Sequence, residues 1–225
     1  SKRNKKISSN LNKRSKKIHI LDKNQNIINK SNWVFLAVTP TVGNKILKNL
    51  KFKKKQTIIS FISTIKMNEL KKFVKVKSKI IRAIPLPFIS LRKGPVPIYP
   101  PNKKVKLFFD KLGTSLEIKN EKSSLNFWSL SSMMAPFYEI LNTLANWLIK
   151  KGIKKQDAQK YITSLFLALS ADAVKQSSKS LENLVKNSQT PKGLNQQALN
   201  ELRKAGFFKH LVGTSNSILK RLKKA

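Results

Sequence analysis

The first half of the chain alternates short β-branched runs with charged amphipathic stretches. Strands are predicted at Ile18–Leu21, Trp33–Val38, Thr57–Ser63 and Lys79–Ile84, and helices or helical turns at Asn4–Ser15, Asn26–Lys30, Val42–Leu50 and Asn68–Phe73. Two of the strands are nearly continuously apolar, as expected of strands that are covered on both faces. Strands that alternate with short helices indicate a parallel sheet built from βα units.

A cluster of prolines between residues 85 and 101 interrupts this alternation and marks loops or edge strands. Beyond the first of these prolines, Val96–Tyr99 is expected to form a strand, Lys103–Leu112 a helix and Ser115–Ile118 a last short strand.

From Glu121 onward the apolar period changes to three and four residues, and no strand pattern competes with it. The apolar positions include Phe137, Ile140, Leu141, Leu144 and Leu148. We therefore predict two domains, an α/β domain at residues 1–118 and an all-helical domain at residues 119–225, with Gly113 and Gly152 as helix stops.

The opening of the chain does not match the usual start of a nucleotide-binding sheet. Such a sheet begins with a strand, a glycine-rich turn and a helix. No Gly-x-Gly-x-x-Gly occurs in this sequence, which starts Ser-Lys-Arg-Asn without an initiator methionine. We expect that a first strand and a glycine-rich loop are missing; the alternative is a complete small protein with a basic tail.

Composition excludes several classes of protein. Of the 225 residues 40% are hydrophobic, which suffices for a globular core, and no apolar run reaches the roughly 18 residues that a membrane span requires. There is no secretory signal pattern at the start. The absence of cysteine excludes disulfides and thiolate metal sites and favours a reduced, cytoplasmic setting.

The net charge of +37 raises the possibility of a polyanion partner. Only six of the 47 basic residues are arginine, the residue best suited to bidentate recognition of bases and phosphates. The lysines are spread over nearly every segment of the sequence, and abundant Asn, Ile and Ser suggest compositional drift. A nucleic-acid partner is therefore disfavoured as the main function, although a lysine-rich polyanion binder stays open as an alternative.

Several motifs resemble, in collinear order, those of the pyrroline-5-carboxylate reductase family. The motifs in the first half are Trp33–Pro40, Thr57–Ile65, Ile81–Pro85 and Lys93-Gly94. Trp33–Pro40 resembles a strand that ends in Ala-Val-Lys-Pro, and Ile81–Pro85 resembles Arg-x-Met-Pro. In the second half, Ala135–Tyr138 resembles Gly-Pro-Ala-Tyr, Thr190–Gly193 resembles Ser-Pro-Gly-Gly, and Ala205–Phe207 resembles Gly-Gly-Phe. No single match is specific, but their order and spacing are.

The resemblance implies a truncated Rossmann-like sheet that binds NADPH or NADH, followed by a helical dimerisation domain. It also implies an oxidoreductase of proline biosynthesis that reduces a C=N bond in a homodimer or larger homo-oligomer. The imine substrate would lie where a helical domain meets the cofactor. No membrane partner and no metal follow from it.

The resemblance assigns cofactor contacts to three regions. Ser1, Lys2 and Arg3 fall on the loop that would hold a 2′-phosphate, where a hydroxyl and cations suit an anion. Asn24 matches a residue that reaches the adenosine ribose. Two turns would flank the dinucleotide. The turn at the end of the second predicted strand comprises Ala37, Val38, Thr39 and Pro40, and the turn at the end of the fourth comprises Ile84, Pro85 and Leu86.

The predicted substrate pocket departs from the family pattern. The resemblance assigns to it Ser132, Met134, Thr190, Gly193 and Asn195. The family's Ser-Gly-Ser-Gly-Pro appears here as Ser132–Pro136 with two methionines, and its Met-Pro-Asn-Thr-Pro appears as Ile84–Phe88 without the asparagine. The pocket is thus more apolar than one built for the pyrroline acid, and the substrate stays open.

Hydride transfer to a protonated imine needs little from side chains, because the cofactor carries the chemistry and the protein aligns the two carbons. Tyr138 and Thr190 are the candidates for a catalytic hydroxyl. The two histidines, His19 and His210, have no carboxylate cluster beside them and predict no metal site. Besides the reductase, a non-catalytic dimeric remnant that has lost the phosphate loop is a second interpretation.

Overall fold

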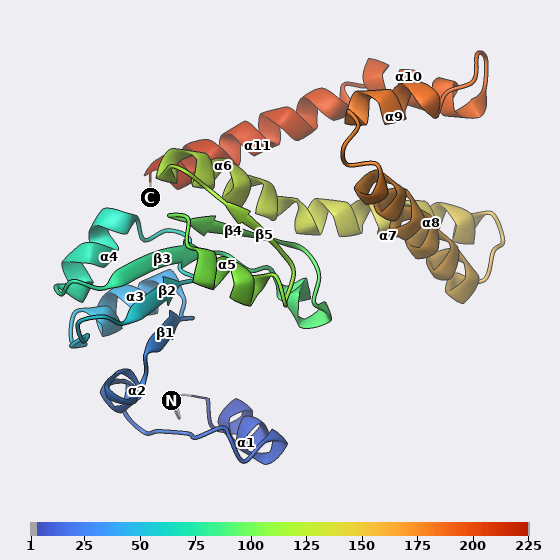
Figure 1. Ribbon diagram of the computed structural model, residues 1–225. Coiled ribbons are helices and arrows are strands. Elements are labelled where there is room, and N and C mark those ends of the chain that lie inside the picture. Colours follow the sequence, from blue (N-terminus) through green and yellow to red (C-terminus); the bar gives the residue numbers. More distant parts are fainter. Residues whose placement is uncertain (1–3, 225) are drawn as a thin grey trace. The chain divides into compact units, whose positions relative to one another are not determined.

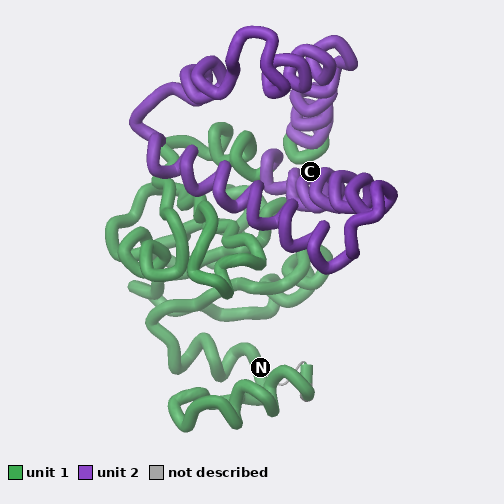
Figure 2. The backbone as a smooth tube through the Cα atoms, turned by 90° about the vertical axis from the view of Figure 1, so that its right-hand side faces the viewer, with its two compact units in different colours: residues 1–128, 221–225 green, residues 129–220 purple. Residues whose placement is uncertain are grey.

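The protein is described by a computed structural model that covers residues 4–224 and divides into two compact units (Figure 2). The first, here called the sheet unit, contains residues 1–128 and 221–225, and the second, the helical unit, contains residues 129–220. The sequence-based division at 118/119 differs in its assignment of two helices: most of α6 (Glu121–Leu130) and the end of α11 (Phe207–Lys224) are part of the sheet unit.

The sheet unit is built on five strands in sequential order (Figure 1). They are β1 (Trp33–Leu36), β2 (Thr57–Ser60), β3 (Lys79–Ala83), β4 (Pro95–Tyr99) and β5 (Thr114–Glu117). The first three strands are parallel, as the sequence predicts, and β5 is parallel to β4. Strand β4 runs antiparallel to β3 because their connection contains only a short 3-10 helix, η1 (Pro87–Leu91), and no crossover helix.

Helices cover both faces of the sheet, which explains why its strands are apolar on both sides. Ile58 and Ile59 of β2 are both fully buried but point to opposite faces. Ile58 lies in a core with α2 (Asn24–Lys30), α3 (Pro40–Leu47) and α4 (Met67–Val74). Ile59 lies in a second core with α5 (Lys103–Phe109).

The strand predicted at Ile18–Leu21 is wrong. This segment follows α1 (Lys5–Arg14) and is irregular, with a single turn-type hydrogen bond from the Ile18 N–H to the Ser15 carbonyl. Its apolar alternation is that of a strand, but a strand needs a partner for its backbone groups. Within residues 4–224 no neighbouring strand pairs with it, and β1 forms the edge of the sheet.

Strand β4 contains two prolines although it lies between β3 and β5. The carbonyls of Gly94 and Ile98 accept hydrogen bonds from the β5 side, so Pro95 and Pro97 face β3. On that side β4 pairs with β3 only through Ile98 and Tyr99. The missing N–H groups of the prolines therefore fall where no ladder is formed.

The helical unit begins at the end of α6 and continues through η2 (Ser131–Met133) to a hairpin of α7 (Met134–Lys150) and α8 (Lys155–Lys175). Gly152, at φ 90°, ends α7 as the sequence predicts. Helices α9 (Leu181–Asn187), α10 (Leu194–Lys204) and α11 (Phe207–Lys224) follow. Among the described residues of this unit, only Ala145, Ala158 and Ile162 are buried apolar side chains, while many large apolar ones are exposed.

None of the helices in residues 4–224 combines the length and apolarity needed to cross a membrane.

Candidate cofactor and substrate site

The carboxyl ends of the three parallel strands meet at one edge of the sheet. Leu36, Ser60 and Arg82 are aligned in register across β1, β2 and β3. The turn after β1 and the turn after β3 therefore leave the sheet at the same edge, one strand apart, which is about 10 Å. In open α/β sheets this edge is where dinucleotides bind.

At the end of β1 the structure brings together three of the residues predicted to contact the cofactor. Asn24 of α2 lies with Ala37 and Val38 along a hollow of about 210 Å³. Thr39 and Pro40 begin α3, and the Gly43 N–H closes its first turn on the Thr39 carbonyl at 2.8 Å. The Thr39 side chain makes no capping hydrogen bond, so the first N–H groups of this helix have no side-chain cap.

At the end of β3 the predicted turn is partly buried. Ala83 is fully buried, whereas Ile84, Pro85 and Leu86 are each half-buried and lead into η1. The Leu86 carbonyl accepts a hydrogen bond from the Ile89 N–H at 2.9 Å. The three side chains thus offer an apolar surface at the edge of the sheet.

Directly before this turn lies Arg82, a charged residue that motif reasoning did not single out as functional. Its side chain is completely buried. One guanidinium nitrogen, Nη1, donates to Glu121 Oε1 of α6, and Nη2 donates to the Ser63 carbonyl at 2.6 Å. The guanidinium also stacks 4.1 Å from the ring centre of Trp128. Arg82 therefore fixes α6 against the end of β3.

Glu121 completes this network, because its Oε1 also accepts the Met67 N–H, at the start of α4, at 2.7 Å. Burial lowers the pKa of Arg82 from its usual value, and the neighbouring Glu121 carboxylate opposes that shift. The Arg82 Nε and the Trp128 Nε1 are buried without a partner among the described residues. A lone arginine in a β-branched run is the sequence signal that could have marked Arg82 as an unusual position, although not its partner.

Ser132, Met134 and Tyr138 lie around the start of α7 in the helical unit. The Ser132 hydroxyl donates to the Ser129 carbonyl at 2.7 Å. Tyr138 is 57% exposed, and its ring lies 6.0 Å from that of Phe137. The Tyr138 hydroxyl is thus presented on the surface of this unit.

Thr190 and Gly193 lie in the loop before α10, and Asn195 lies in the first turn of that helix. The Gly193 N–H donates to the Thr190 carbonyl at 2.9 Å, and Asn195 Nδ2 donates to the Ser188 carbonyl at 2.9 Å. A side chain at Gly193 would collide with the Thr190 hydroxyl. These hydrogen bonds stay within the loop and the start of α10, so the structure does not join them to Ser132, Met134 and Tyr138.

Ser1, Lys2 and Arg3, predicted to hold a 2′-phosphate, lie outside the described residues. Within residues 4–224 no group of three His, Asp or Glu side chains is placed to hold a metal ion.

Comparison with known proteins defines the class of the chain. Residues 128–225 match the family model described as pyrroline-5-carboxylate reductase dimerisation. No curated protein sequence matches. The fold is that of a Rossmann-like sheet followed by a helical dimerisation domain.

Solved structures match 91% or more of the chain. The 1-pyrroline-5-carboxylate reductase of Streptococcus pyogenes superposes with a TM-score of 0.84 at 24% identity, covering 100% of this chain and 86% of that one. The Plasmodium falciparum pyrroline carboxylate reductase, solved with NADP bound, gives 0.79 at 20% identity over 91% of this chain and 80% of its own. A reductive aminase of Aspergillus terreus, in complex with NADPH and ethyl levulinate, gives 0.59 at 11% identity over 99% and 84%. Residues 128–225 thus match this family's dimerisation domain, and the chain as a whole has the fold of the solved pyrroline-5-carboxylate reductases.

Proposed function

We propose that the protein is an NAD(P)H-dependent reductase that acts on a C=N bond of the pyrroline-5-carboxylate type. The observation that supports this most directly is the pair of turns, Ala37–Pro40 and Ile84–Leu86, at the carboxyl edge of three parallel strands in a chain with the fold of this family. Two such turns, one strand apart, can flank an extended dinucleotide.

The residues of the chain have positioning roles in this proposal. A bound reduced nicotinamide would supply the hydride. Asn24, Ala37 and Val38 would hold the adenosine side, while Ile84, Pro85 and Leu86 would exclude water beside the ring. A protonated imine is already electrophilic, so a hydroxyl such as that of Tyr138 or Thr190 is enough to orient it.

The substrate pocket in this proposal takes residues from two subunits. Ser132, Met134 and Tyr138 would line one side, and Thr190, Gly193 and Asn195 another. The match to a dimerisation domain and the many exposed apolar side chains of the helical unit support a homodimer or larger homo-oligomer. Because Met133 and Met134 replace small residues of the family motif, we propose an imine substrate that is bulkier or more apolar than the pyrroline acid.

Two finer features complete the proposal. Lys2 and Arg3 favour NADPH over NADH, since cations suit a 2′-phosphate. The chain contains no cysteine, which fits a cytoplasmic location. The likeness to pyrroline-5-carboxylate reductases supports a role in proline biosynthesis or a related route.

The cofactor site is tested by one substitution at each edge of the sheet. Val38 and Val76 are both partly buried and pack against the same core, but Val38 lies at the carboxyl edge and Val76 at the amino edge. Val38→Asp places a negative charge beside the expected pyrophosphate and should weaken NADPH binding about tenfold or more, or ~1.4 kcal/mol. Val76→Asp should leave NADPH binding unchanged. Nicotinamide fluorescence measures both, and equal losses would contradict the assignment.

A second candidate function is a dimeric binding module without catalysis. The observation that favours it is the match of residues 128–225 to a dimerisation domain, which concerns assembly of subunits and not cofactor binding. If the unsubstituted chain binds NADPH no better than Val38→Asp does, this alternative replaces the reductase.

A further inference from the structure

Two lysine-rich segments far from the candidate cofactor edge form one surface of the sheet unit. Residues 48–55 and residues 71–79 contain five lysines each and no acidic residue. The first segment precedes β2, and the second runs from the last turn of α4 to the first residue of β3, so they lie at the amino ends of the parallel strands, opposite the turns described above. The ten residues, here called the basic face, are Lys48, Lys51, Lys53, Lys54, Lys55, Lys71, Lys72, Lys75, Lys77 and Lys79.

Hydrogen bonds join the two segments directly. The Lys55 N–H donates to the Lys77 carbonyl at 3.3 Å, and the Ser78 hydroxyl donates to the Lys53 carbonyl at 2.9 Å. All ten lysines are exposed, and within residues 4–224 none forms an ion pair. Lysines that are dispersed along the sequence are therefore concentrated in space, without neutralising partners.

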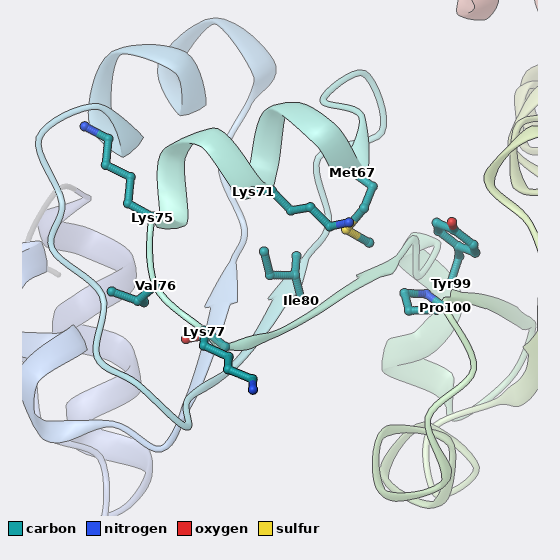
Figure 3. A pocket seen from close by; sticks show the side chains of 9 residues that line it. Met67, Lys71, Lys75, Val76, Lys77, Ile80, Tyr99 and Pro100 are labelled. Atoms are coloured by element: carbon teal, nitrogen blue, oxygen red, sulfur yellow. The ribbon is translucent and has the colours of Figure 1, made fainter.

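Two hollows lie along the basic face and share Lys75. One, of about 570 Å³, is lined by Lys48, Lys51 and Lys75 together with Phe73. The other, of about 380 Å³, is lined by Lys71, Lys75 and Lys77 and extends to Tyr99, which pairs with Arg82 near the carboxyl edge (Figure 3). In Figure 3 the three lysine side chains point in different directions and do not converge on one point. This arrangement suits an extended chain of negative charges better than a single small anion.

We propose that the basic face binds single-stranded nucleic acid through its phosphate backbone. Lysine ammonium groups neutralise successive phosphates without reading sequence, and the partly buried ring of Phe73 gives a base an apolar surface to pack on. A membrane fits less well, because none of the large apolar side chains exposed in the described chain lies between residues 48 and 79. This proposal does not depend on the reductase activity.

The test compares two variants that lose the same charge. The first carries Lys51→Gln, Lys54→Gln, Lys75→Gln and Lys77→Gln on the basic face. The control carries Lys103→Gln, Lys104→Gln, Lys111→Gln and Lys119→Gln, which are exposed lysines of the same unit outside that face. Binding of a fluorescent oligouridylate is followed by anisotropy over a range of salt concentrations. Circular dichroism checks that each variant is folded; if the first is not, Lys54→Gln with Lys77→Gln takes its place.

The first variant should bind at least about tenfold more weakly than the unsubstituted protein at low salt, and its log–log salt slope should fall by about 3, or about 0.7 for each lost phosphate contact. The control should change affinity less than twofold. Equal losses in both variants would show that diffuse charge, not a site, attracts the nucleic acid. Absence of binding at physiological salt, or stronger binding to phosphatidylserine–phosphatidylcholine vesicles than to the oligonucleotide, would also overturn the proposal.

Discussion

At the scale of single residues, Arg82 is the clearest case of a side chain that costs free energy to bury and is held by specific partners. A buried guanidinium is expensive unless its charge and its N–H groups are satisfied. Glu121 supplies the charge, the Ser63 carbonyl accepts a second hydrogen bond, and Trp128 provides a ring face. The same carboxylate accepts the Met67 N–H, so one pair connects β3, α4 and α6.

Removal of one partner should therefore be worse than removal of both. Glu121→Gln leaves the Arg82 charge buried and unpaired, and should lower the free energy of unfolding by about 3 kcal/mol or more. Arg82→Met combined with Glu121→Gln should be less destabilising than the sum of the two single variants. Urea denaturation of all four proteins measures this coupling, and strict additivity would mean that the pair is not coupled.

Two glycines should respond in opposite ways to the same substitution. Gly94 has φ 94°, and the Phe88 ring occupies the position that a Cβ would take. Gly94→Ala should therefore destabilise the sheet unit by about 1–3 kcal/mol. Gly213 lies within α11 with open space around it, so Gly213→Ala should stabilise that helix by about 0.5–1 kcal/mol. Thermal melts that show the same sign for both would contradict this reading of the backbone.

At the scale of elements, apolar periodicity predicted every strand that pairs in the structure and the change to helices after residue 118. It failed at Ile18–Leu21, because periodicity reports which residues suit a strand but not whether a partner strand is present. It could not give the direction of β4, which depends on the length and path of the connection from Ile84 to Gly94.

The sequence predicted the cofactor side of the candidate site better than the substrate side. Asn24, Ala37 and Val38 were assigned from separate motifs, and the structure brings them to one hollow because α2 packs beside the end of β1. The loop at Thr190–Asn195 and the start of α7 carry no signal in the sequence that would say whether they meet within one chain or between two. The buried pair Arg82–Glu121 joins residues 39 positions apart, a separation at which single-sequence reasoning has no pairing rule.

Helix α8 is the element whose exposed apolar side chains most need a partner. Tyr161, Leu167, Leu169 and Val174 are each more than half exposed, at 62%, 63%, 58% and 73%. Surfaces of this kind usually mark protein–protein contacts. Leu165→Asp with Leu169→Asp, one helical turn apart, should therefore shift the protein from an oligomer to a single chain.

Light scattering coupled to gel filtration measures that shift. A matched control carries Leu91→Asp with Leu107→Asp, two exposed leucines of the sheet unit. It should keep the oligomer. If both double variants keep it, α8 is not part of the interface.

At the scale of the whole molecule, the two edges of one sheet have different roles in this account. The carboxyl edge, with Ala37–Pro40 and Ile84–Leu86, is assigned to the dinucleotide, and the amino edge, with the basic face, to a polyanion. The helical unit contributes the family's dimerisation domain and candidate substrate residues. NADPH should therefore not compete with oligouridylate, apart from a weak effect of its own phosphates that salt removes.

The central claim is that this chain passes a hydride from a bound nicotinamide to an imine. The most direct measurement is the oxidation of NADPH by the purified protein with pyrroline-5-carboxylate and with bulkier cyclic imines as substrates, followed by nicotinamide absorbance. We predict oxidation that depends on both imine and protein, is strongly reduced in Val38→Asp at subsaturating NADPH and is kept in Val76→Asp. Oxidation that is absent with every imine, while the protein is folded and binds NADPH, would contradict it.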